Sequence, residues 1–287
     1  MKRITSLILA VVMIALSAFA FAACEKASTS NKFGVQAGTT GYSFLKGDEE
    51  WGFEGFDNLD IRSYDNAGQA VADMKNGNIS YVVIDADVAR NLVAANEGIK
   101  MIDVALTTEA YGIAVDKNQA DLLASVNQIL ADKKSDIDAI FKKYENVDDN
   151  NAANWNGTTI PAGTYDASKD QLVVATNAAF APFEFAAGDA FAGIDMEIAK
   201  LIADALGKEL VIVNMDFEAV AGAVGNNGID IALSGMTINE VRKKVVNFSN
   251  PYYTEAYQVV ICMKDNAVFD DCKTTEAMLK IMKDIGA

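Results

Sequence analysis

The sequence predicts an α/β protein with mostly parallel sheets, and three features support this prediction. The chain has 287 residues, which is enough for two domains. From Phe33 onward, short β-rich runs alternate with helical patterns, which is the order of an α/β architecture. Most of the strand-like runs are unbroken apolar runs, as expected for strands buried on both faces.

Seven runs are predicted as strands. Ligands of such sheets bind at the carboxyl ends of the strands, where loops converge, so the residues that follow these runs are site candidates. The predicted strands are Lys32–Gln36, Ser80–Ile84, Gly112–Val115, Leu172–Ala175, Leu210–Val213, Ile229–Leu233 and Gln258–Met263.

Four stretches between the strands have the apolar stripe of a helix. Asp195 is predicted to cap one of them, which Gly207 ends. A second follows Asn66 and closes at Gly77. The other two stripes lie within residues 122–130 and 137–144.

One stretch, from about Glu145 to Asp170, has no periodic apolar face. It is rich in Asn, Asp, Gly, Thr and Ala, which is typical of a linker or a long surface loop. Trp155 within it either pins the loop to the surface or has no such role.

Charge and composition exclude several classes of function. The formal net charge is −16, which argues against nucleic acid and anionic lipid surfaces, since these require clustered Lys and Arg. The sequence contains no histidine, so the commonest general base and metal ligand is missing. Cys and carboxylates do not show metal-ligand spacing. We therefore expect neither a cofactor nor a metal.

The N-terminus predicts export. Lys2 and Arg3 precede an uncharged run from Ile4 to Phe21, and small residues lead to Cys24, a pattern that resembles the lipobox of bacterial lipoproteins. We expect a signal peptide over 1–23 and a lipidated tether over 24–31. An ordinary cleaved signal peptide or a retained membrane helix are the alternatives.

Two further cysteines, Cys262 and Cys272, lie near the other end of the chain. An exported protein allows a disulfide between them, and two separate thiols are the alternative.

Two blocks of the sequence carry a series of short motifs. The later block contains Leu172-Val-Val-Ala-Thr-Asn177, Phe180-Ala-Pro-Phe183, Gly193-Ile-Asp195, Met215-Asp216-Phe217, Ser234-Gly235-Met236-Thr237, Arg242-Lys-Lys and Tyr252-Tyr253. The earlier block contains Gln36-Ala-Gly38-Thr39-Thr40-Gly41, Val82-Val-Ile-Asp85 and Tyr111-Gly-Ile-Ala-Val115. The later block resembles the first half, and the earlier block the second half, of the amino-acid-binding proteins of bacterial ABC importers (solute-binding lipoproteins of the family 3 type).

The order of the two blocks predicts a circular permutation, in which the segment 145–170 joins the family's usual termini. A piece of a tandem protein with its missing lobes elsewhere is the alternative. The resemblance implies the two-lobed periplasmic-binding-protein fold of type II, with two crossing hinge segments. Lobe 1 would span 111–253, and lobe 2 would combine 32–108 with 256–287.

The resemblance also implies a pocket for a free amino acid. Arg242 would bind the ligand carboxylate through paired charge-assisted hydrogen bonds. Thr39 and Thr40, at the predicted start of a helix, would offer backbone N–H groups to the same carboxylate. Asp85 would bind the ammonium. By pattern alone, Arg242 also fits a solvated charged turn and Asp85 a helix cap.

Further pocket residues follow from the same motifs. Gly235 and Thr237, with the adjacent Ser234, would supply backbone and hydroxyl contacts, while Phe180 and Phe217 would enclose the ligand side chain. By composition alone, both phenylalanines fit a hydrophobic core.

Two residues bear on specificity. Relatives that bind basic or amide side chains often have Asp at the position of Asn177, so its neutral amide favours a neutral polar ligand over a basic one. Gln36 is placed to contact a polar ligand side chain.

The implied function is capture of an amino acid outside the cytoplasmic membrane by a lipid-anchored monomer, which delivers it to ABC permease subunits. Enzymes that resemble cyclohexadienyl dehydratases share the fold, and there a carboxylate such as Asp85 or Glu184 would supply acid–base chemistry. A component that presents ligand to a sensor is a third possibility.

Overall fold

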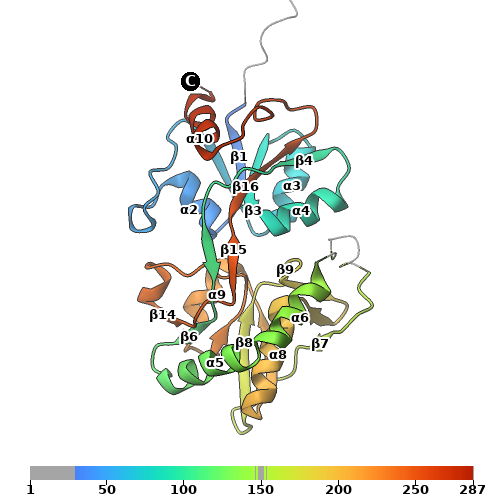
Figure 1. Ribbon diagram of the computed structural model, residues 1–287, viewed down its shortest axis with the longest axis vertical. Coiled ribbons are helices and arrows are strands. Elements are labelled where there is room, and N and C mark those ends of the chain that lie inside the picture. The colour runs from blue at the N-terminus through green and yellow to red at the C-terminus, as the bar shows by residue number, and fades with distance from the viewer. Residues whose placement is uncertain (1–29, 146, 148–151, 153, 287) are drawn as a thin grey trace, which may run out of the picture.

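The computed structural model describes residues 30–145, 147, 152 and 154–286. Two lobes follow one another along the long axis of the molecule, and two crossing strands join them (Figure 1). The predicted signal peptide (1–23) and the lipidation site Cys24 lie outside the described residues. None of the helices in the described part of the chain has both the length and the apolar character that crossing a membrane requires.

The upper lobe in Figure 1, which we call lobe 2, contains a five-stranded sheet in the order β2-β1-β3-β16-β4. The first three strands are parallel, and β16 is antiparallel to both its neighbours. Because β16 comes from near the end of the chain, this sheet combines two distant stretches of sequence. Its strands are β1 (Lys32–Gln36), β2 (Asp60–Tyr64), β3 (Tyr81–Asp85), β4 (Ile99–Ile102) and β16 (Gln258–Met263).

Lobe 1 repeats this arrangement with the order β12-β8-β13-β6-β14. Here β12, β8 and β13 are parallel, and β6 is antiparallel to β13 and β14. The strand that breaks the parallel pattern again comes from a distant stretch. The strands are β6 (Ala114–Asp116), β8 (Gln171–Thr176), β12 (Glu209–Asn214), β13 (Ile231–Ala232) and β14 (Val246–Phe248).

Helices flank both sheets, and their apolar faces pack on the strands as the helical patterns predict. Lobe 2 contains α2 (Thr40–Lys46), η1 (Glu49–Trp51), α3 (Ala67–Lys75), α4 (Ala86–Ala95) and α10 (Thr275–Asp284). Lobe 1 contains α5 (Ala120–Asp132), α6 (Lys134–Tyr144), α8 (Ile194–Leu206), α9 (Phe217–Ala223) and the 3₁₀ helix η2 (Arg242–Lys244).

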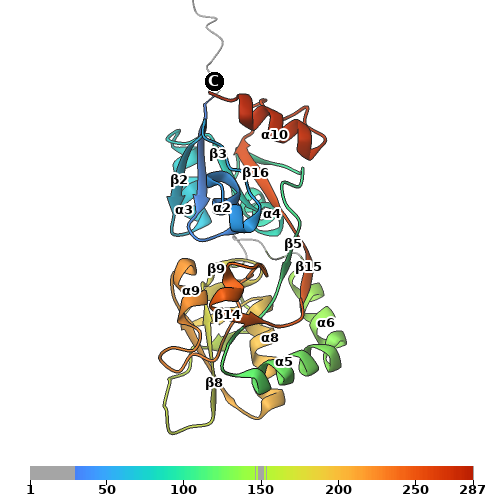
Figure 2. The same cartoon turned by 90° about the vertical axis from the view of Figure 1, so that its left-hand side faces the viewer.

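The hinge consists of β5 (Glu109–Tyr111) and β15 (Tyr253–Ala256), which pair in antiparallel fashion. They run side by side between the lobes in both views (Figures 1 and 2). This confirms the predicted α/β fold with two lobes and two crossing segments.

The predicted linker is exposed over most of its described length. It contributes the short strand β7 (Ile160–Pro161), which pairs with β11 (Ala190–Ala192) in a small sheet. Trp155 does pin the segment, since its ring stacks on Tyr144 at a centroid distance of 5.3 Å. The other strands of this sheet are β9 (Ala179–Phe180) and β10 (Glu184–Ala187).

The prediction that Asp195 caps a helix is wrong. Helix α8 begins at Ile194, and Gly193 is the N-cap residue with φ 123°. A Cβ atom at Gly193 would lie 2.2 Å from the carbonyl oxygen of Phe183, so only glycine fits there. The side chain of Asp195 instead points inward and accepts hydrogen bonds in the lobe interior.

The ends of the described chain lie together at the outer end of lobe 2, where β1 begins and α10 is followed by Gly286 (Figure 1). Asn58 joins them, because its Nδ2 donates to the carbonyl oxygens of Met282 (2.8 Å) and Ile285 (2.7 Å). Asn31 in turn donates to the carbonyl oxygen of Asn58 at 2.6 Å.

Cys262 and Cys272 are both buried and unpaired, so the alternative of two separate thiols is the one that the structure shows.

Candidate functional site

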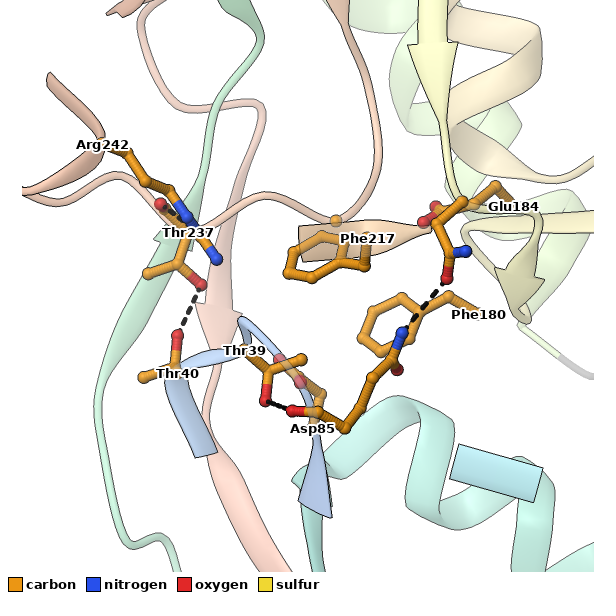
Figure 3. A pocket seen from close by; sticks show the side chains of 11 residues that line it. Thr39, Thr40, Asp85, Phe180, Glu184, Phe217, Thr237 and Arg242 are labelled. Atoms are coloured by element: carbon orange, nitrogen blue, oxygen red, sulfur yellow. Dashed lines mark hydrogen bonds between the residues drawn. The ribbon is translucent and has the colours of Figure 1, made fainter. Parts of the chain in front are cut away.

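A small pocket lies between the two lobes beside the hinge strands. Lobe 2 and lobe 1 both contribute walls to it (Figure 3). Its lining consists of Gln36, Thr39, Thr40, Asp85, Asn177, Phe180, Glu184, Phe217, Gly235, Thr237 and Arg242.

Arg242 enters this pocket from η2 and is 8% exposed. Its guanidinium donates to the carbonyl oxygens of Thr237 (2.8 Å) and Gly38 (3.0 Å). Its Cζ also lies 5.2 Å from the ring centroid of Trp51 and 5.3 Å from that of Phe217. No carboxylate among the described residues forms an ion pair with it within 4.0 Å. Arg242 is therefore a buried cation bonded to neutral groups, and not the solvated turn residue that its sequence also allowed.

Burial lowers the pKa of Arg242 to about 10, against the opposing fields of Glu109 and Asp85. The side chain remains charged at neutral pH, and a small carboxylate in the pocket would meet a desolvated guanidinium.

Asp85 is the last residue of β3 and occupies the N-cap position of α4 without a side-chain capping bond. Its Oδ1 instead accepts a short hydrogen bond from the hydroxyl of Tyr111. Burial first, and then the nearby Glu109 carboxylate, raise the pKa of Asp85 to about 7. An ammonium group in the pocket would stabilise the ionised form.

The end of the pocket at Gln36 and Asn177 is polar, and some of its buried oxygen atoms have no hydrogen-bond partner among the described residues. Gln36 Nε2 donates to Asn177 Oδ1 at 3.1 Å, which joins the lobes, while Gln36 Oε1 is buried without a partner. Phe180 closes one wall, and a Cβ atom at Gly235 would lie 2.8 Å from its ring. Gly235 therefore allows the ring to approach the backbone.

Glu184 also lines this end, and sequence reasoning had considered it only for an enzyme. Its Oε1 accepts from Ser234 Oγ at 2.9 Å, whereas its Oε2 is buried without a partner. Burial, followed by the field of Asp195, raises the pKa of Glu184 well above its ordinary value. Asp195 has a pKa raised to about 7 by burial, although its bonds from Gly235 N (2.8 Å) and the Tyr252 hydroxyl (2.9 Å) oppose this.

The lobes are closed on each other around the pocket. Besides the Gln36–Asn177 bond, Thr40 Oγ1 lies 3.1 Å from Thr237 Oγ1, as Figure 3 shows. Outside the pocket, Asn91 Nδ2 donates to the carbonyl oxygen of Ala181 at 2.8 Å.

The structure brings together ten of the eleven residues predicted to bind ligand. Ser234 lies just behind the lining, where it bonds to Glu184 and to the backbone N–H of Asn177 (3.0 Å). Phe217 contacts the Arg242 guanidinium as well as the pocket. Thr39 caps α2, as the predicted helix start requires, since its Oγ1 accepts from Tyr42 N.

Sequence reasoning missed three contributors: Trp51, Glu109 and Tyr111. Trp51 lies in a segment without any periodic pattern, so nothing in the sequence placed it over Arg242. Tyr111 appears in the sequence only as the start of a family-like motif and Glu109 in no motif at all, because a linear pattern does not show which side chains face the cleft.

In the described part of the chain, no group of three or more His, Cys, Asp and Glu side chains is arranged to hold a metal ion.

One protein-family model matches the later part of the chain. The model of the bacterial extracellular solute-binding proteins, family 3, matches residues 172–285. The arginine-binding extracellular protein ArtP of Bacillus subtilis (strain 168) is 38% identical over 103 residues, which are 36% of this chain and 40% of that protein. The cyclohexadienyl dehydratase of Pseudomonas aeruginosa is 30% identical over 99 residues, or 34% of this chain and 37% of the enzyme.

Among solved structures, the arginine-bound form of domain 1 from TmArgBP is 35% identical. The match covers 40% of this chain and 90% of that domain, with a TM-score of 0.28. The chain thus spans about two fifths of the length of the curated relatives it matches.

Proposed function

We propose that this chain, whose residues 172–285 match the model of the bacterial extracellular solute-binding proteins of family 3, captures a free amino acid for an ABC importer. The main support is the pair of buried, opposite charges on the two sides of one pocket. Arg242 in lobe 1 has no carboxylate partner, and Asp85 in lobe 2 has no cation within ion-pair distance among the described residues. A zwitterion would satisfy both groups.

Closure of the lobes would follow from the placement of the two charged groups on different lobes. A ligand whose carboxylate binds Arg242 and whose ammonium binds Asp85 favours the closed arrangement by its differential affinity for closed over open. Each charged hydrogen bond contributes about 1.5–3 kcal/mol net, so a few of them suffice for micromolar affinity.

We propose a neutral polar side chain with a hydrogen-bond donor for the preferred ligand. Asn177 offers no negative charge, and the raised pKa of Glu184 favours its neutral form, so a buried cation would lack a counter-ion. The unpartnered Oε1 of Gln36 accepts from such a donor.

The proposed setting is the outer face of the cytoplasmic membrane. Lipid at Cys24 would anchor a monomer there, in reach of the permease subunits. We further propose that the chain is a circular permutant of its family, with 145–170 as the joining segment. The identical strand order of the two lobes supports this, because each lobe is complete within one chain.

An enzymatic role is the second candidate, since one relative is a dehydratase and two pocket carboxyls, Asp85 and Glu184, have raised pKa values. A buried guanidinium placed for an α-carboxylate supports binding instead. Formation of product from prephenate or arogenate would favour the enzyme.

The test is a thermal-melt screen of residues 25–287 against the twenty amino acids, followed by titration calorimetry. A ligand at about a hundred times its dissociation constant stabilises by about 2.7 kcal/mol. We expect a neutral polar amino acid to give the largest shift and Arg242→Ala to abolish it.

Lys243→Ala is the matched control, because Lys243 is the next residue of η2 but is 45% exposed and paired with Glu240. It should bind as the wild type does. If no amino acid shifts the melting of a cooperatively folded protein, the proposed function is wrong.

A further inference from the structure

A buried carboxylate, Glu109, lies in the hinge strand β5 and directly contacts the pocket wall. It is 7% exposed and accepts three hydrogen bonds. Its Oε1 accepts from Thr107 Oγ1 (2.6 Å) and Gln258 Nε2 (3.0 Å), both in lobe 2. Its Oε2 accepts from Thr237 Oγ1 (2.6 Å) in lobe 1. Glu109 therefore lies in β5, which joins the lobes, and forms hydrogen bonds to residues of both lobes.

These bonds determine the direction of the hydrogen bonds between the hydroxyl groups of the cleft, that is, which group donates and which accepts. A carboxylate can only accept, so the single hydroxyl proton of Thr237 points to Glu109. Thr237 Oγ1 is then the acceptor in its 3.1 Å contact with Thr40 Oγ1. The Thr40 hydroxyl of lobe 2 thus donates to Thr237 of lobe 1, and the Thr237 hydroxyl donates to Glu109.

This direction determines what Thr237 can offer a ligand. A hydroxyl has one proton and two lone pairs, and here the proton and one lone pair are already engaged. The remaining lone pair of Thr237, a residue that lines the pocket, can only accept. It suits the ligand ammonium and cannot donate to the ligand carboxylate.

We propose that Glu109 is a positioning residue that holds Thr237 as an acceptor for the ligand ammonium, beside Asp85. This inference rests on the proposed capture of an amino acid. Through Glu109, ligand recognition is coupled to the hinge. The sequence assigned Thr237 a general hydroxyl contact. The hinge carboxylate makes that contact specific to the positive end of the ligand.

The same carboxylate influences Asp85 through its charge. After burial, the field of Glu109 is the largest cause of the raised Asp85 pKa. Replacing Glu109 by a neutral side chain should therefore lower the pKa of Asp85. The titratable, charged and polar groups that act on Asp85 or feel its field are Glu109, Tyr111, Gln258, Glu184 and Arg242.

The decisive variant is Glu109→Gln, which preserves size and removes the charge. Its amide can donate to Thr237, which frees the hydroxyl proton and removes the fixed acceptor. We expect affinity for the amino acid found in the screen to fall about tenfold at pH 8. We also expect the midpoint of the acid limb of the affinity profile to move to lower pH.

A merely structural role for Glu109 would weaken binding without moving that midpoint. Glu109→Asp separates the two effects, because it retains the charge but shortens the reach to Thr237. It should lose affinity and keep the wild-type midpoint. Glu255→Gln on the paired hinge strand β15 is the control, since Glu255 is exposed, and it should leave both affinity and midpoint unchanged.

A ligand-free readout keeps this inference distinct from the proposed function. In folded protein labelled with ¹³C at carboxyl groups, the Asp85 titration should shift to lower pH in Glu109→Gln and not in Glu255→Gln. If the wild type binds no amino acid, the proposed function fails while this titration still tests Glu109. If Glu109→Gln binds with wild-type affinity, or leaves the Asp85 titration in place, the inference is overturned.

Discussion

Lobe 1 and lobe 2 share one strand order but contribute unequally to the pocket. In each sheet, three parallel strands are followed by an antiparallel strand from a distant part of the chain and then by an edge strand. Lobe 1 supplies seven of the eleven lining residues, among them Arg242 and both phenylalanines, and lobe 2 supplies four. The two lobes therefore share a sheet topology but contribute different side chains to the pocket.

Under the proposed function, this difference would divide ligand recognition between the lobes. Lobe 1 presents the guanidinium of Arg242, the apolar walls and Glu184, which would bind the carboxylate and side chain of a ligand. Lobe 2 adds Asp85, which would bind the ammonium, and the polar side chain of Gln36. A ligand would then rest on lobe 1 and complete its contacts when lobe 2 closes.

The largest expected effect follows from removing the lobe 2 charge. Asp85→Ala should weaken amino acid binding about 100-fold, because the ligand ammonium would be buried without a partner. Calorimetry measures the loss. Asp60→Ala in the same lobe, whose side chain is 48% exposed, should bind normally. A loss below about threefold for Asp85→Ala would mean that lobe 1 alone holds the ligand.

Specificity should respond to Asn177, on the lobe 1 side. Asn177→Asp places a negative charge beside Gln36 and Glu184, which should improve binding of basic amino acids about tenfold relative to neutral ones. Competition between arginine and glutamine in the thermal-melt assay reports the ratio. Asn214→Asp, at the exposed end of β12, serves as the control. An unchanged ratio would remove Asn177 from the specificity determinants.

Each lobe contains one buried aspartate with a pKa of about 7, Asp195 in lobe 1 and Asp85 in lobe 2. A pKa raised in the folded state stabilises the protein below the unfolded value near 4, and this stability is lost as pH rises to about 7. Without ligand, Asp195→Asn and Asp85→Asn should each gain melting temperature over the wild type between pH 4 and pH 7, by a few degrees.

Ligand should separate the two aspartates. Bound ammonium stabilises the ionised form of Asp85, so saturating ligand should cancel the advantage of Asp85→Asn and leave that of Asp195→Asn. Melting curves at pH 4, 5.5 and 7, with and without ligand, decide between these outcomes. Equal behaviour of both variants would contradict an ammonium subsite in lobe 2.

The smallest effect is expected from rearranging the chain. Joining Gly286 to Asn31 by a short linker and opening the chain between the exposed residues Asn156 and Gly157 would restore the order of motifs that the proposed permutation implies for the family. Because termini on an exposed surface tolerate such changes, affinity should stay within about threefold. Opening the buried strand β8 between Val173 and Val174 is the control and should prevent folding.

Much of the fold could be predicted because its signals are local. Strands β3 and β8 are buried along their whole length, and their unbroken apolar runs reveal this in the sequence. Strand β2 escaped detection, because it lies at a sheet edge and is mostly polar. Asp195 was misplaced because a helix-start pattern cannot show that the carboxylate points inward.

The residues that line the pocket could be predicted through motifs, but the side-chain contacts around them could not. Arg242 and Asp85 could be found because each belongs to a short motif that resembles the family. Trp51 and Glu109 reach the pocket through tertiary contacts over 128 residues or more, for which the sequence holds no local sign. Contacts of that kind depend on how the lobes close.

The two ends of the described part of the chain meet on lobe 2, and this has a mechanical consequence. A pull applied ahead of Asn31 enters β1, an interior strand held on both sides by parallel ladders to β2 and β3. Such a load acts along the strand and is resisted in shear within one sheet. It does not pass through β5 and β15, so tension on the N-terminal segment would leave the cleft free to open and close.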